Sequence, residues 1–395
     1  MGPPQENWKR RRAAISPFFS TARIRTLDPI MQKHMAKMLA RMEDLARKGT
    51  IARMHYVIKA GTSDIINTWA FGCSFGLLDK EDFGQSYYEA TDVFFYLSHW
   101  FGQFTWLADI LHSLPLWLVA TLVPPLREMY CKKTFWVNRL RQIRSSPESD
   151  AFQSTIFEGV LNGKLESEDK SDERLANEAQ LLVFAGEGTT AYTLSAAVYE
   201  ILAHPDVVRR LRDELIRALP YADAIPSFAQ VEGLPYLHAV VQETVRLHPG
   251  VMGRQVRISP EAPIVYRDRR SGAEYQLPPG TLTSMSPLTT HMNAEVFVDP
   301  YEFVPQRWID NPLIAASFIG FSRGSRNCVA MNFARKELAV IIATIFRQYD
   351  LYQGQQGKTM ELYETERKRD IDPTSDLIIP APARGSQGLR VRIRL

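Results

Sequence analysis

The chain has 395 residues, 45% hydrophobic and 23% charged, which excludes a wholly disordered or collagen-like protein and allows one large domain or a few smaller ones. Lysine and arginine number 47 against 44 acidic residues, and this near balance argues against nucleic acid as a partner, which would need a concentrated basic surface. Three cysteines are an odd and sparse set that cannot build a disulfide framework, which indicates a reducing compartment.

Helical patterns dominate the first two thirds of the chain. The charged start, MGPPQENWKRRR, has no apolar run for a signal peptide. A first helix from Trp8 to Ile15 is interrupted at Pro17, and the polar stretch 145–171 is expected to be a surface connection. Apolar periodicity predicts further helices over 30–45, 54–71, 172–203, 207–218 and 230–247. The helix over 172–203 is far longer than a usual globular helix.

An apolar segment lies at 104–126. It contains Asp109, His112 and Pro115, and its uninterrupted apolar run is much shorter than the ~20 residues that cross a bilayer. Two interpretations stay open for this segment. It forms buried helices joined by a turn, or it forms a surface that dips into a membrane interface.

The second half of the chain changes to alternating patterns. Residues 263–266 and 273–277 flank the turn sequence RRSG at 269–272, which predicts a β-hairpin. Residues 281–285 are a candidate third strand, and 388–395 (GLRVRIRL) alternates as a terminal strand. We therefore expect a single domain over 1–395 that is mainly α with minor β-sheets.

The most informative segment surrounds Cys328. Residues 320–324, GFSRG, match the G-x-S-x-G of the α/β hydrolases, but that fold needs a histidine after the serine, and the last histidine, His291, comes before it. An apolar face predicts a helix that begins just after Cys328. Free backbone N–H groups at that helix start, together with Arg326, would lower the pKa of the thiol. This environment suits either a metal-bound thiolate or a buried structural cysteine.

The string from Phe321 to Ala330 resembles the haem-binding loop of the cytochromes P-450, which reads Phe, two residues, Gly, x, Arg, x, Cys, x, then Gly or Ala. The resemblance implies haem b (iron protoporphyrin IX) as cofactor, with Cys328 as the axial thiolate of the iron. It further implies that Phe321 shields the sulfur and that Arg326 pairs with a haem propionate. Ala330 stands where glycine is more usual.

A second motif is an E-x-x-R pair together with a later arginine. Glu243 and Arg246 form an E-x-x-R pair on one helical face, and Arg307 lies in the segment FVPQRW, which resembles the family's Phe-x-Pro-x-Arg. The resemblance implies a Glu-Arg-Arg network that is structural and holds the haem loop.

A third motif, AGEGTT at 185–190, falls in the middle of the long helix. Each glycine there costs ~1 kcal/mol against alanine, which indicates a close helix contact or a widened functional groove. The motif resembles the family's oxygen-binding helix, which implies Thr189 as the proton-relay residue, with Glu187 and Thr190 as further catalytic candidates. Gly188 stands where the family has an acid, and Glu187 is rotated from that position by ~100°.

A fourth motif is the W-x-x-x-R spacing of Trp8 and Arg12, which resembles the family's propionate-binding helix. Arg254 follows the E-x-x-R helix where the family often has another propionate arginine. The resemblance covers nearly the whole chain and is strongest to fungal members. It implies a cytochrome P-450 fold lacking its N-terminal part, since family members carry an anchor, early helices and most of a sheet before the first haem-contacting helix. That missing start is expected to make the chain bind haem weakly.

The resemblance implies a monooxygenase that uses O₂ and electrons from an NADPH-dependent cytochrome P-450 reductase to hydroxylate or epoxidise an apolar small molecule, in secondary metabolism. The reductase is expected on a basic patch of Arg323, Arg335 and Lys336. The substrate pocket is expected from 94–123, 177–190, 250–253 and 377–379. The full-length family type resides on the cytosolic face of the endoplasmic reticulum, whereas a chain without an anchor is expected to be soluble in the cytoplasm.

Two alternatives remain. A non-catalytic haem-binding remnant is favoured by the missing start and by Gly188. A haem-thiolate isomerase or dehydratase needs no O₂, but the Thr189-Thr190 pair argues for oxygen chemistry.

Overall fold

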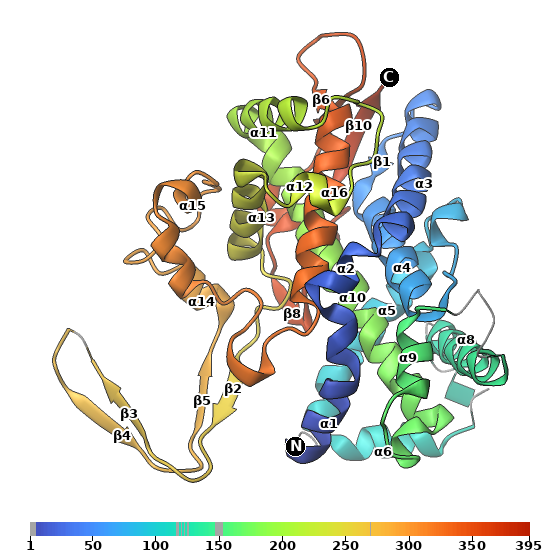
Figure 1. Ribbon diagram of the computed structural model, residues 1–395, viewed down its shortest axis with the longest axis vertical. Helices are drawn as coiled ribbons and strands as arrows, with labels where there is room; N and C mark the ends of the chain where they lie inside the picture. Colours follow the sequence, from blue (N-terminus) through green and yellow to red (C-terminus); the bar gives the residue numbers. More distant parts are fainter. Residues whose placement is uncertain are drawn as a thin grey trace.

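The computed structural model describes residues 5–115, 118–119, 121, 123–124, 126–146, 153–268 and 270–395. Parts of the predicted apolar segment at 104–126, of the connection at 145–171, and the hairpin turn residue Arg269 lie outside these ranges. Helices form most of the described chain, as the sequence predicted (Figure 1).

The first half is helical. It contains α1 (Gln5–Ile15), α2 (Thr21–Arg25), α3 (Asp28–Arg47), α4 (Met54–Phe71), α5 (Gln85–Gln103), α6 (Thr105–Ser113), α8 (Leu126–Ser145) and α9 (Ile156–Asn162). The second half contains α10 (Asp172–Ala203), α11 (Pro205–Ala218), α12 (Phe228–Val231), α13 (Pro235–Leu247), α14 (Pro287–His291), α15 (Arg307–Asp310) and α16 (Met331–Gln348).

The long helix α10 runs through the centre of the molecule (Figure 1). The Ser171 hydroxyl caps its start by accepting from the Arg174 N–H, and His204-Pro205 ends it because proline cannot continue the hydrogen-bond ladder. It packs against α4, α8, α13 and α16, and buried residues occur on several of its faces. A helix surrounded in this way supplies a rigid wall for any site beside it.

The strands form one small sheet and three separate pairs. In the four-stranded sheet the order is β1 (Ala52–Arg53), β10 (Arg390–Arg394), β7 (Thr359–Leu362) and β6 (Asp350–Leu351). The pairs are β2 (Gln255–Ile258) with β5 (Leu282–Met285), β3 (Ile264–Arg267) with β4 (Glu274–Leu277), and β8 (Ser375–Leu377) with β9 (Ile379–Ala381). The β3–β4 ribbon extends away from the helical body (Figure 1).

Three predicted segments differ from the structure. The helix predicted over 230–247 is two helices, because Gly233 and Pro235 separate α12 from α13. The connection predicted over 145–171 contains α9, which buries Ile156 and Phe157 in the core. The strand predicted over 281–285 pairs with β2, which the sequence analysis did not identify.

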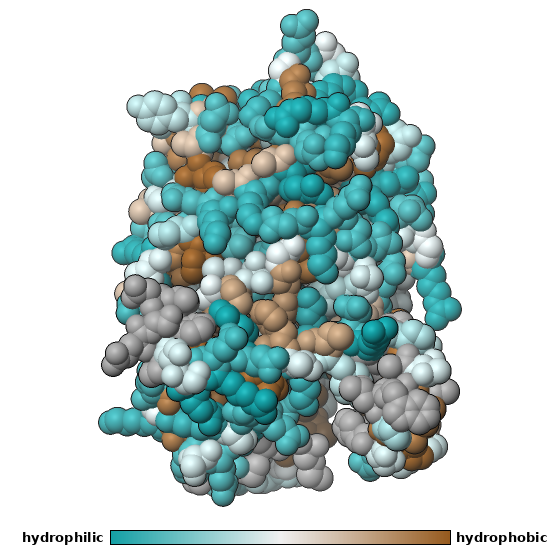
Figure 2. All heavy atoms as spheres, turned by 90° about the vertical axis from the view of Figure 1, so that its right-hand side faces the viewer, coloured by the Kyte–Doolittle hydropathy of each residue, from teal (hydrophilic) through white to brown (hydrophobic). Residues whose placement is uncertain are grey.

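The apolar segment at 104–126 is not simply buried. Phe104, Trp106 and Ile110 are all at least 44% exposed, whereas Val119 is fully buried. No helix in the described ranges has both the length and the apolar character needed to cross a bilayer. The face seen in Figure 2 is mainly hydrophilic, with isolated hydrophobic residues.

Candidate functional site

The loop before α16 positions Cys328. The Cys328 N–H donates to the Phe321 carbonyl at 2.9 Å. The loop therefore folds back on itself and brings the backbones of these two residues together. Ser322 and Gly324 have φ values of 60° and 74°, the left-handed conformation that such a reversal requires. The Cys328 side chain is left exposed to a cavity.

This cavity, called here the thiol cavity, has a volume of about 1130 Å³ including its open mouth. It lies between the Cys328 loop, the start of α16 and the middle of α10. Its volume is in the range of pockets that bind small molecules and cofactors. Its wall is mainly apolar on the α13 and α16 side and carries hydroxyls on the α10 side. The lining residues include Ala185, Thr189, Thr190, Val245, Val251, Arg257, Phe321, Ser322, Arg326, Cys328, Ala330 and Phe333.

Burial raises the pKa of the Cys328 thiol, against the opposing effects of the Ala330 N–H and the positive charge of Arg12. The sequence prediction of a lowered thiol pKa is therefore wrong for the protein alone, because desolvation outweighs the helix N-terminus. A coordinated metal cation deprotonates a thiol outright, so a metal bound at Cys328 would outweigh this effect of burial.

The residues predicted to hold the propionates lie beside the Cys328 loop. The Arg326 guanidinium stacks on the Trp8 ring, 3.7 Å from its centroid, and Arg326 lines the thiol cavity. Arg12 donates to the Asn327 carbonyl at 2.8 Å and to the Asn327 side-chain oxygen at 2.7 Å. These contacts tie α1 to the loop that carries Cys328, although Trp8 and Arg12 are not among the lining residues described.

Arg257, and not the predicted Arg254, is among the described residues that line the thiol cavity. Arg254 is exposed and makes no hydrogen bond or ion pair in the part of the chain that the structure describes. Arg257 lines the thiol cavity and donates to the Ser322 hydroxyl at 2.8 Å. The sequence analysis did not single out Arg257, whose signal was its position on an alternating strand directly after the E-x-x-R helix.

The α10 candidates point in different directions. Thr189 and Thr190 line the thiol cavity, and the Thr189 hydroxyl donates to the Ala185 carbonyl at 2.7 Å. Glu187 is buried away from this cavity, where its carboxylate accepts a hydrogen bond from the Tyr87 hydroxyl at 2.6 Å. Burial raises the pKa of Glu187, which favours its neutral form.

The two glycines of α10 meet bulky neighbours. A Cβ at Gly186 would lie 2.9 Å from Ile66 of α4, and one at Gly188 would lie 2.2 Å from Ile379 of β9. The predicted close contact between helices therefore occurs at Gly186, whereas Gly188 lies against a strand. No acidic residue lines the thiol cavity among the residues described.

A buried network supports the loop. Glu243 accepts from Arg246 at 2.8 Å and from Arg307 at 3.1 Å, so the geometry joins the three residues of the predicted Glu-Arg-Arg network. His291, which the sequence analysis used only to exclude a hydrolase, connects this network to the loop. Its Nε2 accepts from the Ile319 N–H at 2.9 Å, and its Nδ1 therefore donates to the Arg246 carbonyl at 3.0 Å.

The predicted basic patch is smaller than expected. Lys336 is fully buried and forms an ion pair with Asp28 at 2.6 Å, so it is not part of a surface patch. Arg323 is exposed, and the Arg335 guanidinium lies over the Phe321 ring at 5.4 Å. The two arginines remain beside the Cys328 loop.

The donor set of the thiol cavity fits haem. A flat, mainly apolar group would find a thiol on one side, threonine hydroxyls on the α10 side, and the guanidinium groups of Arg326 and Arg257 for its carboxylates. The segments predicted to form the substrate pocket divide between two cavities. The thiol cavity is lined by Ala185, Gly186, Thr189, Thr190, Gly250 and Val251, and another cavity is lined by Phe95, Glu187, Gly188, Leu377 and Ile379.

Comparisons with known proteins show the family of the chain. The cytochrome P-450 family model matches residues 3–368. The chain is 35% identical to cytochrome P-450 monooxygenase tpcC of Cochliobolus heterostrophus, over 97% of the chain and 74% of that protein. It is 31% identical to astB of Talaromyces wortmannii (99% and 75% covered) and 31% identical to the fusicoccadiene C-8 hydroxylase of Alternaria brassicicola (98% and 73%). The chain therefore belongs to the cytochrome P-450 family, as a monooxygenase.

Proposed function

We propose that Cys328 is the axial ligand of haem iron in this chain, and that the enzyme hydroxylates or epoxidises an apolar small molecule with O₂. The observation that carries the proposal is the thiol cavity, which brings Cys328 together with Thr189 from segments far apart in the sequence. A relative named for hydroxylation of fusicoccadiene at C-8 supports hydroxylation of an apolar compound.

Haem with a thiolate ligand supplies the activation of O₂, and the protein supplies binding, orientation and proton management. Phe321 lines the thiol cavity with Cys328 and would shield its sulfur, and Arg326 and Arg257 offer positive charge to carboxylates. The Thr189 Oγ1 holds its proton toward the Ala185 carbonyl, so its lone pairs are free to accept from a water in the cavity. The apolar wall around Val245 and Phe333 excludes bulk water.

We infer that electrons come from an NADPH-dependent reductase that docks on the face bearing Cys328. Arg323 and Arg335 provide the positive charge at that face. The aromatic patch of α5 and α6, formed by exposed Tyr96, Trp100, Phe104 and Trp106, supports contact with a membrane interface, in keeping with a site on the endoplasmic reticulum.

A non-catalytic haem-binding protein is the second candidate. It is favoured by the absence of an acidic side chain from the described lining of the thiol cavity. Glu187 is held by Tyr87 on another side of α10, and Ile379 packs where an acid at position 188 would stand. In this candidate haem is bound, but turnover with NADPH and reductase is absent.

The reduced carbon-monoxide difference spectrum tests the proposal. The parent chain loaded with haem is expected to give the spectrum of a thiolate-ligated iron, and Cys328→Ala is expected to lose it completely. Cys73→Ala and Cys131→Ala are the matched controls and should retain it, since neither cysteine lines the thiol cavity. A thiolate-type spectrum that persists in Cys328→Ala would contradict the assignment.

A further inference from the structure

The helix α1, which carries Trp8 and Arg12, has little hydrophobic anchorage. Of its residues 7–15, whose exposure the structure describes, none is buried, and Ile15 at its end is only partly packed against the core. The helix lies beside α9 (Figure 1). Because packing of an apolar face is the main source of helix stability in a folded protein, polar contacts must supply much of what fixes α1 in place.

A single carboxylate, that of Asp169, binds two arginines of this helix. Arg10 contacts one Asp169 oxygen through its Nε at 3.0 Å and through a terminal nitrogen at 2.8 Å. Arg11 contacts the other oxygen through its Nε and a terminal nitrogen, both at 2.9 Å. The Asp169 side chain is only 4% exposed. Each oxygen of a buried carboxylate is thus matched to one guanidinium group, the geometry of a strong ion pair.

Asp169 is charged at neutral pH. Burial opposes its negative charge, but the hydrogen bonds from Arg11 and Arg10 outweigh burial and hold the pKa of the carboxyl below its ordinary value. A neutral side chain at this position would leave two guanidinium groups without their shared acceptor. The neighbouring Glu168 does not replace it, because Glu168 is exposed and its side chain makes no hydrogen bond or ion pair among the described residues.

The remaining contacts of α1 belong to the Cys328 loop. Arg12 donates to the backbone and side chain of Asn327, and the Trp8 ring stacks with Arg326. The helix therefore bridges the segment before α10 and the loop that carries the thiol. Because the arginine that meets the loop directly follows the two that meet the carboxylate, a shift of α1 away from the carboxylate would displace its contacts with the loop.

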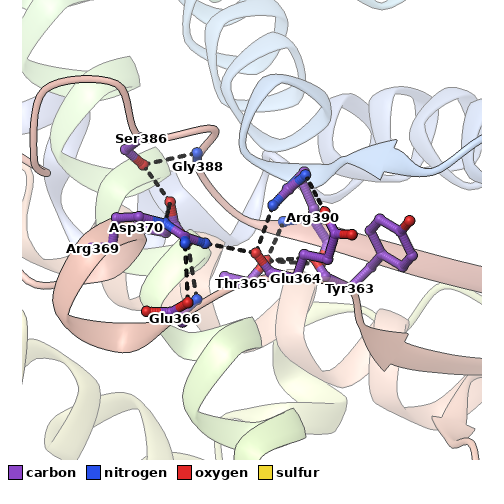
Figure 3. Close-up of polar contacts among 9 residues, drawn as sticks. All are labelled: Tyr363, Glu364, Thr365, Glu366, Arg369, Asp370, Ser386, Gly388 and Arg390. Carbon is purple, nitrogen blue, oxygen red and sulfur yellow. Dashed lines mark hydrogen bonds and ion pairs between the residues drawn. The ribbon is translucent and has the colours of Figure 1, made fainter.

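Asp370 provides a comparison. It is as buried as Asp169 and also accepts from an arginine, but its partner Arg369 is its neighbour in the chain, and Ser386 lies on the turn that follows (Figure 3). Its contacts therefore support a local turn. The two arginine partners of Asp169 are 159 and 158 residues away from it, so these ion pairs join the first helix of the chain to a distant segment.

We propose that Asp169 is a positioning residue for the proposed haem site: it holds α1 in place, and α1 in turn fixes the Cys328 loop through Arg12 and Trp8. The inference rests on the proposed function, because it concerns retention of the haem bound beside Cys328. Asp169 acts only through α1, since it is not among the described residues that line the thiol cavity.

Transfer of haem to excess apomyoglobin measures this retention. Asp169→Asn is expected to lose haem at least fivefold faster than the parent, while the urea midpoint of the haem-free chain shifts little, because residues 7–15 contribute no buried side chain. Glu168→Gln is the matched control. It removes the same charge one position earlier and should change the rate less than twofold. Asp169→Glu keeps the charge and should recover part of the retention.

Trypsin measures the docking of α1 without haem. The sequence KRRR at 9–12 offers cleavage sites that a docked helix protects. Cleavage within 9–12 of the haem-free chain should be at least fivefold faster in Asp169→Asn and unchanged in Glu168→Gln. A parent chain that takes up no thiolate-ligated haem would be a failure of the proposed function, whereas equal cleavage of the parent and Asp169→Asn would be a failure of Asp169 as the anchor of α1.

A multiple-variant comparison separates these ion pairs from a general effect on the fold. In a chain that already carries Arg10→Gln and Arg11→Gln, Asp169→Asn should accelerate haem loss no further, because its partners are gone. A further acceleration of the same size in that background would overturn the proposal. Faster cleavage of Asp169→Asn without faster haem loss would do so too, and so would a large fall in its urea midpoint, which would show that Asp169 supports the whole fold.

Discussion

At the scale of single residues, Thr189 is the side chain whose hydroxyl faces the thiol cavity from α10. Thr189→Ala is expected to keep haem but to lower product formed per NADPH consumed at least severalfold, because the hydroxyl that holds a proton or water is lost. Thr189→Ser is the control and should recover most of the coupling. Parent-like coupling in Thr189→Ala would transfer the role to Thr190 or Thr193, whose side chains also line this wall.

Arg257 gives a second prediction at this scale. Arg257→Ala is expected to lower haem retained per polypeptide after gel filtration, since it removes a cavity-lining cation and the hydrogen bond to Ser322. Arg254→Ala removes the same charge three residues away, from a side chain outside the cavity lining, and should have little effect. Equal losses in the two variants would show that general charge, rather than position, matters.

Much of the thiol cavity could be predicted from sequence because its members lie in short contiguous motifs. Phe321, Arg326, Cys328 and Ala330 share one ten-residue loop, and local backbone geometry alone brings them together. Arg257 could not be predicted in the same way, because strand pairing between β2 and β5 decides which of two nearby arginines reaches the loop. The direction of the Cys328 pKa shift also depends on burial, which no local pattern reports.

At the scale of secondary-structure elements, α10 shows why glycine stands in the interior of a helix, where it lowers helix propensity. Gly186→Ala gains ~1 kcal/mol of helix propensity, but its Cβ would lie 2.9 Å from Ile66, and overpacking of this kind costs ~1–3 kcal/mol. We therefore expect net destabilisation in urea unfolding. Ile66→Ala removes the Cγ1 carbon that the new Cβ would meet, so the double variant should lose less stability than the sum of the two single variants. Additive losses in the two variants would argue against direct contact.

Helix boundaries were predictable where capping residues and prolines mark them. The predicted range 172–203 coincides with α10, since Ser171 caps its start and Pro205 follows its end. The boundary between α12 and α13 was missed, although Gly233 and Pro235 stand there, because apolar residues continue on both sides. The segment at 104–126 was ambiguous because exposed aromatic residues give the same local pattern as buried ones.

At the scale of the whole molecule, buried charge joins distant parts of the fold. Glu243 and Arg246 are fully buried, and the arginine also donates to the Pro300 carbonyl at 2.6 Å. The network therefore fixes the long connection between β5 and α16 against α13. His291 extends it to Ile319 at the base of the Cys328 loop, so the stability of the fold and the position of the thiol are physically linked.

This link makes stability depend on pH. Burial lowers the pKa of both His34 and His291 to about 4, below the ordinary value of about 6.5. Between pH 6.5 and 4 the unfolded chain therefore binds protons that the folded chain does not, and stability falls as pH falls. Each histidine is expected to contribute a loss of about 2 kcal/mol between pH 7 and pH 5. Asp370, with a pKa lowered to about 2, stays ionised throughout this window.

Burial also lowers the pKa of His55, to about 3, so it adds to the same loss. Urea unfolding at pH 7 and pH 5 measures the total, and His291→Gln should reduce it because it removes one of the three buried histidines. Protonation of Nε2 in His291 also abolishes its bond from the Ile319 N–H. Acid should therefore weaken haem retention in the parent and in His34→Gln, which keeps His291, and this acid-dependent loss should be absent from His291→Gln. His99→Gln, at an exposed position, is the control and should keep the full pH dependence. An unchanged pH dependence in both buried-histidine variants would show that other groups govern acid unfolding.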